Sequence, residues 1–240
     1  MACVQCWLAL SVRFAKSLLP ETNELTELLS LYQPHKGGRL NLVVSAGAEV
    51  AGDSGTSDDL SNSLDRALLR ELRKQADAVV TSGASVRAER LRASSHVPIF
   101  VLTKAGSIAG FETILDDANR RPVTLITLSI FAAAIRGQLD EAGFKNKVVE
   151  VEDLSPVLVW SALQKTGNEK LLFEFGPSLA NLWTNSRLIS EVCLTTTGVS
   201  ENFRTSLPAF IEGFKATPSS SFYSTETSSR FDRFQLLSSV

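Results

Sequence analysis

The segment Glu169-Lys-Leu-Leu-Phe-Glu-Phe-Gly-Pro-Ser-Leu-Ala-Asn-Leu182 predicts a buried strand that leads directly into a helix. Its apolar run, 171–173, is typical of a strand that is covered on both faces. Gly176 ends the run, and Pro177 suits the first turn of a helix, where a missing N–H costs nothing. Such a turn leaves free backbone N–H groups at the positive end of a helix dipole, which favours phosphate, although many similar turns bind nothing.

The composition is that of one large globular domain. The chain has 240 residues, of which 44% are hydrophobic, enough for a substantial core. We expect an N-terminal extension over residues 1–17 and a single domain over residues 18–240. The formal charge of -2 comes from 24 basic and 26 acidic residues spread along the chain. This balance argues against a nucleic-acid partner and against a polybasic membrane patch.

The cysteines and the N-terminal segment indicate the compartment. Cys3, Cys6 and Cys193 are too few and too scattered for a disulfide framework, which favours a reducing compartment. Residues 1–16 are apolar in part but lack a basic start and a small-residue cleavage site, so they do not resemble a signal peptide. No stretch approaches the roughly 18 uninterrupted apolar residues of a membrane span. We therefore expect a cytoplasmic protein with no membrane partner.

Strand-like and helix-like segments alternate along the sequence. Strands are predicted at 40–45, 77–81, 98–103, 111–115, 122–127, 147–151, 171–173, 189–197 and 230–238. Helices are predicted at 21–32, 64–74, 129–142 and 154–165, with shorter ones ending at Glu89 and beginning at Pro177. We expect Ser129 to cap the helix that it begins. The alternation predicts an α/β fold with a mostly parallel central sheet, helices on both faces and one or two antiparallel edge strands.

Several chemistries lack their motifs. There is no Gly-x-Gly-x-x-Gly after a strand and no phosphate-binding Gly-x-x-x-x-Gly-Lys-Ser/Thr. Gly52-Asp-Ser-Gly55 matches the nucleophile segment of trypsin-like proteases, but the order of a catalytic triad is wrong around it. With only His35 and His96, the sequence predicts no zinc-deaminase site and no metal site.

Two small-residue turns remain, Ser82 to Ser85 and Gly176 to Leu179, each after a predicted buried strand. The carboxyl ends of parallel strands lie at one edge of a sheet, so two such turns suit a dinucleotide better than a single phosphate. Thr103 and Thr127 also end strands, where a hydroxyl either bonds a ribose or phosphate or simply terminates the strand.

These segments carry a family resemblance. Asp77-Ala-Val-Val-Thr-Ser-Gly-Ala-Ser-Val-Arg-Ala-Glu89 resembles the segment Asp-Ala-Val-Leu-Val-Gly-Ala-Gly-Thr-Val-Arg-Ala-Asp of the riboflavin-biosynthesis pyrimidine reductases. Glu174-Phe-Gly-Pro-Ser-Leu179 is similar to that family's Glu-Gly-Gly-Pro-Thr-Leu. The resemblance extends from Leu18 to the C-terminus, in the manner of reductases without the deaminase domain. It implies a dihydrofolate reductase-like fold.

The resemblance also implies a function. It suggests a homodimeric, NADPH-dependent reductase of 5-amino-6-(5-phosphoribosylamino)uracil, with a phosphorylated small molecule as substrate. By position, the residues on the NADPH side are Ser82, Gly83, Ala84, Ser85, Thr103, Thr127, Phe175, Gly176, Pro177, Ser178 and Leu179. The positions on the substrate side are Ser45, Asp53, Ser54, Ser61, Arg87 and Glu174. Arg87 is the natural anion partner, because a guanidinium can hold phosphate with two bonds. No catalytic residue is assigned.

Two departures from the family pattern keep alternatives open. The first strand ends in Ser45-Ala-Gly-Ala48, where the family has Ser-Leu-Asp-Gly, so an acidic group near the substrate is absent. Phe175 replaces a glycine. Pointing inward it belongs to the core, whereas pointing outward it occupies the space of the nicotinamide. The alternatives are a diverged, non-catalytic nucleotide-binding homologue and a reductase of a pterin-like or folate-like substrate.

Overall fold

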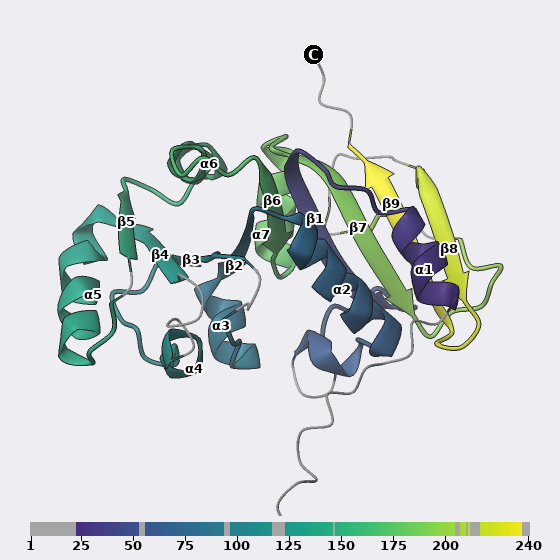
Figure 1. The fold of residues 1–240 in the computed structure, drawn as a ribbon, viewed down its shortest axis with the longest axis horizontal. Coiled ribbons are helices and arrows are strands. Elements are labelled where there is room, and N and C mark those ends of the chain that lie inside the picture. Colours follow the sequence, from purple (N-terminus) through teal and green to yellow (C-terminus); the bar gives the residue numbers. More distant parts are fainter. Residues whose placement is uncertain are drawn as a thin grey trace, which may run out of the picture.

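The computed structural model describes residues 23–52, 56–93, 97–116, 123–145, 147–204, 207–209, 211 and 217–236 (Figure 1). Within these residues the strands are β1 (Gly37–Ser45), β2 (Ala78–Ser82), β3 (Ile99–Thr103), β4 (Val123–Leu128), β5 (Lys147–Val151), β6 (Lys170–Glu174), β7 (Ile189–Thr197), β8 (Ser220–Ser224) and β9 (Ser229–Gln235). The α-helices are α1 (Asn23–Ser30), α2 (Ser63–Gln75), α3 (Gly83–Glu89), α4 (Glu112–Asp116), α5 (Ser129–Glu141), α6 (Pro156–Gln164) and α7 (Pro177–Asn185), and a 3-10 turn, η1, spans Ser57–Asp59.

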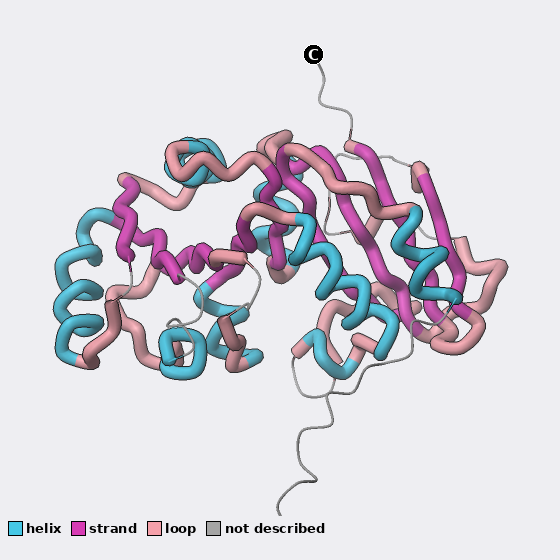
Figure 2. The backbone as a smooth tube through the Cα atoms, viewed as in Figure 1, coloured by secondary structure: helices cyan, strands magenta, loops and turns pink. Residues whose placement is uncertain are grey.

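The strands form one sheet in the order β5-β4-β3-β2-β6-β1-β7-β9-β8 (Figure 2). Every pair from β5 to β7 in this order is parallel. β9 pairs antiparallel with both β7 and β8, at one edge. The predicted fold class is therefore confirmed. The predicted extension over residues 1–17 lies outside the described residues.

Each face of the sheet has its own apolar core. Helices α1 to α5 cover one face through side chains such as Leu28, Leu68 and Ile135. Helices α6 and α7 cover the other through side chains such as Val159 and Trp183. Figure 1 shows α1 and α2 in front of the sheet. Because most strands are buried on both faces, they read in the sequence as continuous apolar runs.

Three details differ from the sequence-based expectation. The predicted strand at 111–115 is wrong, because the short helix α4 occupies Glu112–Asp116. Phe111, Ile114 and Leu115 are all buried, and their i, i+3, i+4 spacing places them on one helical face. Ser129 does not cap α5: the N-cap is Leu128, and the Ser129 hydroxyl donates to the Val151 carbonyl at 3.3 Å. β8 is a strand that the sequence analysis did not predict.

Helix α2 is fixed at both ends. At its start, the Asn62 side chain accepts hydrogen bonds from the amides of Leu64 and Asp65, both at 3.0 Å. Such a cap satisfies N–H groups that a helix cannot bond internally. At its end, Gln75 accepts a hydrogen bond from Arg39 at 3.1 Å and donates one to the Tyr32 carbonyl at 2.9 Å.

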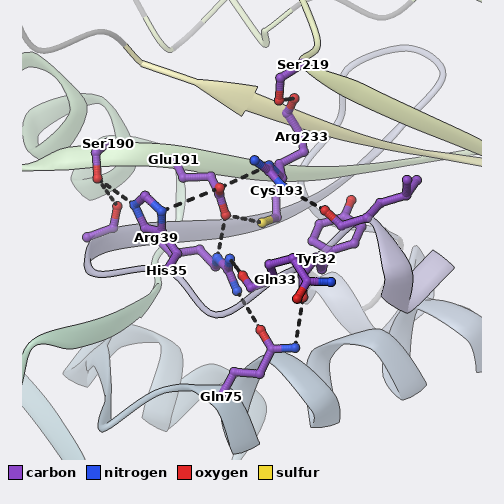
Figure 3. Close-up of polar contacts among 12 residues, drawn as sticks. Tyr32, Gln33, His35, Arg39, Gln75, Ser190, Glu191, Cys193, Ser219 and Arg233 are labelled. Atoms are coloured by element: carbon purple, nitrogen blue, oxygen red, sulfur yellow. Dashed lines mark hydrogen bonds and ion pairs between the residues drawn. The ribbon is translucent and has the colours of Figure 1, made fainter.

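Arg39 belongs to a buried polar network near the amino ends of β1 and β7 (Figure 3). Its Nε donates to Glu191 Oε1 at 2.5 Å, and Arg233 Nε lies 3.1 Å from Glu191 Oε2. One buried carboxylate thus offsets two guanidinium groups. The Cys193 thiol also points at Glu191, and burial raises the pKa of this thiol, so it stays protonated. The network ties β1, β7, β9 and α2 together.

None of the described helices is long and apolar enough to cross a bilayer.

The network yields the first prediction. Glu191→Gln leaves the buried guanidinium of Arg39 and the partly buried one of Arg233 without this counter-charge, so it lowers the free energy of unfolding by about 3–5 kcal/mol. Arg136→Gln is the control, because it breaks the half-exposed Arg136–Glu150 pair and costs less than about 1 kcal/mol. Urea denaturation compares the two. Equal effects would contradict the assignment.

Candidate functional site

The candidate site lies where two neighbouring strands send their helices to opposite faces. β2 and β6 are parallel and adjacent, with Thr81 opposite Glu174. After β2, α3 packs through Val86 on the α2 face. After β6, α7 packs through Ala180 and Trp183 on the other face. The two connections diverge, which opens a crevice at the carboxyl ends of the strands, the usual ligand position in open α/β sheets.

Phe175 points into the core. Its side chain is 5% exposed, and its ring centroid lies 5.4 Å from that of Phe173 and 5.7 Å from that of Trp183. Such tilted aromatic pairs stabilise a core beyond simple burial. The phenyl ring therefore lies on the α7 side of the sheet, and the turn beyond it stays open.

The turn into α7 exposes backbone. Gly176 is the N-cap, and no side chain caps this helix. A Cβ atom at Gly176 would meet no heavy atom within 4 Å. The amides of Ser178 and Leu179 in the first turn thus have no side-chain acceptor, while Leu179 also packs on the core. This open cradle fits the pyrophosphate of a dinucleotide.

The turn after β2 is filled by its own side chains. The Ser82 hydroxyl accepts a hydrogen bond from the Ser85 amide at 3.0 Å and lies 2.9 Å from the Ser85 hydroxyl. Gly83 is buried, and a Cβ atom there would lie 2.9 Å from the Phe111 ring and 3.0 Å from Arg87 Nη1. Gly83 is therefore required by packing.

Arg87 fastens a loop. Its guanidinium donates to the carbonyls of Gly83, Ser107 and Ala109, at 2.9–3.0 Å. It also stacks over the Phe111 ring, 4.3 Å from the centroid. These contacts turn the guanidinium toward the 107–109 loop and away from the cavity described next.

A cavity of about 540 Å³ extends from the two turns across the end of β6 and the middle of β1 to α2 and η1. This volume lies within the range for small-molecule sites. The predicted site residues that line it are Ser61, Ala84, Ser85, Glu174, Phe175, Gly176 and Pro177. Those that do not line it are Ser45, Ser82, Gly83, Arg87, Thr103, Thr127, Ser178 and Leu179. Asp53 and Ser54 lie outside the described residues.

The strand-end hydroxyls bond locally or are buried. Ser45 accepts hydrogen bonds from the amides of Gly47 and Glu49, and closes the turn after β1. Thr103 accepts a hydrogen bond from the Ala105 amide at 3.3 Å. Thr127 is fully buried, and its hydroxyl has no partner within the described part of the chain.

A row of arginines that were not among the predicted site residues lies along the cavity. Arg66, Arg70 and Arg73 lie at i, i+4 and i+7 of α2, so they share one helical face, and all three line the cavity. Arg73 Nε and Nη2 donate to the two carboxylate oxygens of Glu174, at 2.7 and 2.6 Å. Among the described residues, Arg66 and Arg70 have no hydrogen-bonded side-chain partner. In the sequence, the i, i+4 and i+7 spacing of the three arginines was the signal that they share one face of the helix.

Two cavity carboxyls have raised pKa values. Burial raises the pKa of Asp65, against the hydrogen bond from Ser61. Burial also raises the pKa of Glu89, which accepts a hydrogen bond from the Ser57 hydroxyl at 3.0 Å and is repelled by Asp58. Perturbed carboxyls in a cleft are typical of functional sites.

Residues 38–199 match the model of the RibD C-terminal domain family. Among curated protein sequences, none matches the chain significantly. Among solved structures, a pyrimidine reductase-like protein from Corynebacterium diphtheriae is similar, with a TM-score of 0.69 and 18% identity over 86% of this chain and 94% of that one.

Two further structures share the fold. The riboflavin biosynthesis reductase of Saccharomyces cerevisiae has a TM-score of 0.64 and 11% identity, over 89% of this chain and all of that one. The deaminase/5-amino-6-(5-phosphoribosylamino)uracil reductase of Thermotoga maritima has a TM-score of 0.62 and 14% identity, over 83% of this chain and 56% of that one. At these identities the likeness shows the fold alone.

The close packing around Gly83, in the turn after β2, yields the second prediction. Gly83→Ala forces Phe111 and Arg87 to move, so it lowers the free energy of unfolding by about 1–3 kcal/mol. Gly137→Ala is the control, because its Cβ would meet nothing within 4 Å and it replaces an exposed helical glycine. Thermal denaturation of both variants checks this. A Gly83→Ala variant as stable as the wild type would refute the packing role.

Proposed function

Because the chain belongs to the RibD C-terminal domain family, we propose that it reduces a phosphorylated aminouracil with NADPH, as a 5-amino-6-(5-phosphoribosylamino)uracil reductase. The family is one of NADPH-dependent reductases. One observation supports the proposal most: Phe175, the main departure from the family motif, is buried beside Trp183, and Gly176 stays open.

NADPH is proposed to bind between the two turns. The amides of Ser178 and Leu179 would hold its pyrophosphate beside Gly176. Ala84 and Ser85 line the opposite wall. When bound, NADPH supplies a hydride, and the protein positions it and excludes water. Ser82, Gly83, Thr103 and Thr127 would support this wall from beneath.

The substrate is proposed to occupy the rest of the cavity, under α2. Arg87 is engaged with three carbonyls, so Arg66 and Arg70 would take the phosphate in its place. Guanidinium groups suit this role because they hold phosphate with two charge-assisted bonds. Arg73 and Glu174 would orient the substrate as a fixed pair, and Ser61 would contact it at the α2 end.

A non-catalytic nucleotide-binding homologue is the second candidate. It is favoured by the turn after β1, where Ser45 bonds the amides of Gly47 and Glu49 and residues 46–48 offer no acid. The family resemblance also carries the proposals of a homodimer, of a cytoplasmic location and of one reductase-like domain over residues 18–240.

The third prediction tests the cofactor site. Gly176→Val fills an open position at a cost of about 1 kcal/mol in capping, but it blocks the approach of a pyrophosphate. We expect NADPH affinity to fall at least about tenfold. Gly137→Ala, also an open position, leaves the affinity unchanged. Titration calorimetry measures both. Failure of the wild type to bind millimolar NADPH would reject the proposal.

The fourth prediction tests the arginine row. Arg66→Gln and Arg70→Gln each remove a charge-assisted bond to phosphate, so KM for the aminouracil phosphate rises about tenfold or more while kcat changes little. Arg136→Gln, outside the cavity, is the control. Steady-state NADPH oxidation measures these constants. An unchanged KM in the double variant would remove the arginines from the substrate site, and turnover by the wild type separates a reductase from a non-catalytic homologue.

A further inference from the structure

We propose that Asp65 supplies the proton that accompanies hydride in the reduction, an inference that rests on the proposed function. When the ribosylamino ring of the substrate opens, its C1–O bond breaks, the ring oxygen gains a proton and the amine nitrogen loses one, which leaves a C=N bond. Reduction of this bond adds a hydride to carbon and a proton to nitrogen. The nicotinamide provides only the first, so an acid at the cavity or water must provide the second. The described lining residues include four carboxyls: Asp58, Asp65, Glu89 and Glu174.

Three of the four are poorly suited. Both oxygens of Glu174 accept hydrogen bonds from Arg73, so neither is left to contact the substrate nitrogen. Asp58 is exposed on η1. Glu89 is half-buried at the end of α3, where its Oε1 accepts the hydroxyl of Ser57 and so fastens η1 to α3. It therefore has a structural task at the rim of the cavity.

Asp65 is the most enclosed of the four. Its side chain is 4% exposed, in the first turn of α2 where that helix meets the sheet. Oδ2 accepts a hydrogen bond from the Ser61 hydroxyl at 2.6 Å, and Oδ1 is buried without a hydrogen bond of ordinary geometry. Burial of the carboxyl in such a low-dielectric site favours its protonated, neutral form.

The surroundings of Asp65 allow both charge states. Burial raises its pKa and is the largest effect. Ser61 before the helix, Thr195 on β7 and the charge of Arg66 oppose it. The N-terminal dipole of α2 likewise favours the carboxylate left after proton transfer. A group whose two forms are both supported is suited to give up and regain a proton.

The step balances. Hydride adds to the carbon of the C=N bond, the π electrons move to nitrogen, and nitrogen takes the proton of the Asp65 carboxyl. The products are the amine, the oxidised nicotinamide and the Asp65 carboxylate, which regains its proton from water.

The fifth prediction concerns the pH dependence. The acid must be protonated, so kcat/KM falls as the pH rises through the Asp65 pKa. This fall forms the alkaline limb of the pH profile. Asp65→Asn lowers kcat by about a hundredfold or more and abolishes this limb. Thr195→Val removes a hydroxyl that favours the carboxylate, so it moves the limb to higher pH. Glu89→Gln, the matched carboxyl control, leaves the limb in place.

A second measurement needs no substrate. In protein labelled with ¹³C at the aspartate carboxyls, the resonance absent from Asp65→Asn should titrate above the usual midpoint of about 4. A midpoint at or below that value overturns the proposal, as does an Asp65→Asn enzyme that keeps its rate and its pH limb. If the wild type does not oxidise NADPH with the aminouracil phosphate, the proposed function itself fails, and this role with it.

Discussion

The alternation of side chains at the end of β6 is the constraint on which the site depends. Successive residues of a strand point to opposite faces, so Phe173 and Phe175 lie in the α7 core while Glu174 faces α2. The same alternation removes a large aromatic ring from the crevice and aims a carboxylate at Arg73. The chain then reaches Gly176 with nothing above it, and the first amides of α7 stay accessible.

The C-terminal end of α2 belongs to a network that stabilises the fold, and its N-terminal end lines the candidate site. At its C-terminal end, Gln75 joins the buried network of Arg39 and Glu191, which locks β1, β7 and β9 together. At its N-terminal end, Asp65 and Arg66 line the cavity. The charges at the first end are paired, whereas at the second end burial raises the pKa of Asp65 and Arg66 has no hydrogen-bonded side-chain partner among the described residues. This contrast separates a structural polar cluster from a candidate site.

The sequence predicted the parallel sheet and both small-residue turns, because buried strands and Gly-Pro boundaries are local signals. It was wrong at 111–115, since a segment of five residues is too short for its pattern to distinguish a helical turn from a strand. It also missed Arg66 and Asp65. An amphipathic pattern identifies the side of α2 that meets the sheet, but not what its polar side faces. That depends on the position of β1 between β6 and β7, a long-range property.

The most direct test of the account is a crystal structure of the protein with NADPH. We predict that the pyrophosphate contacts the amides of Ser178 and Leu179, that Phe175 stays packed against Trp183, and that the nicotinamide extends toward α2. A structure in which Phe175 swings into the crevice, or in which the cofactor binds away from Gly176, would contradict it.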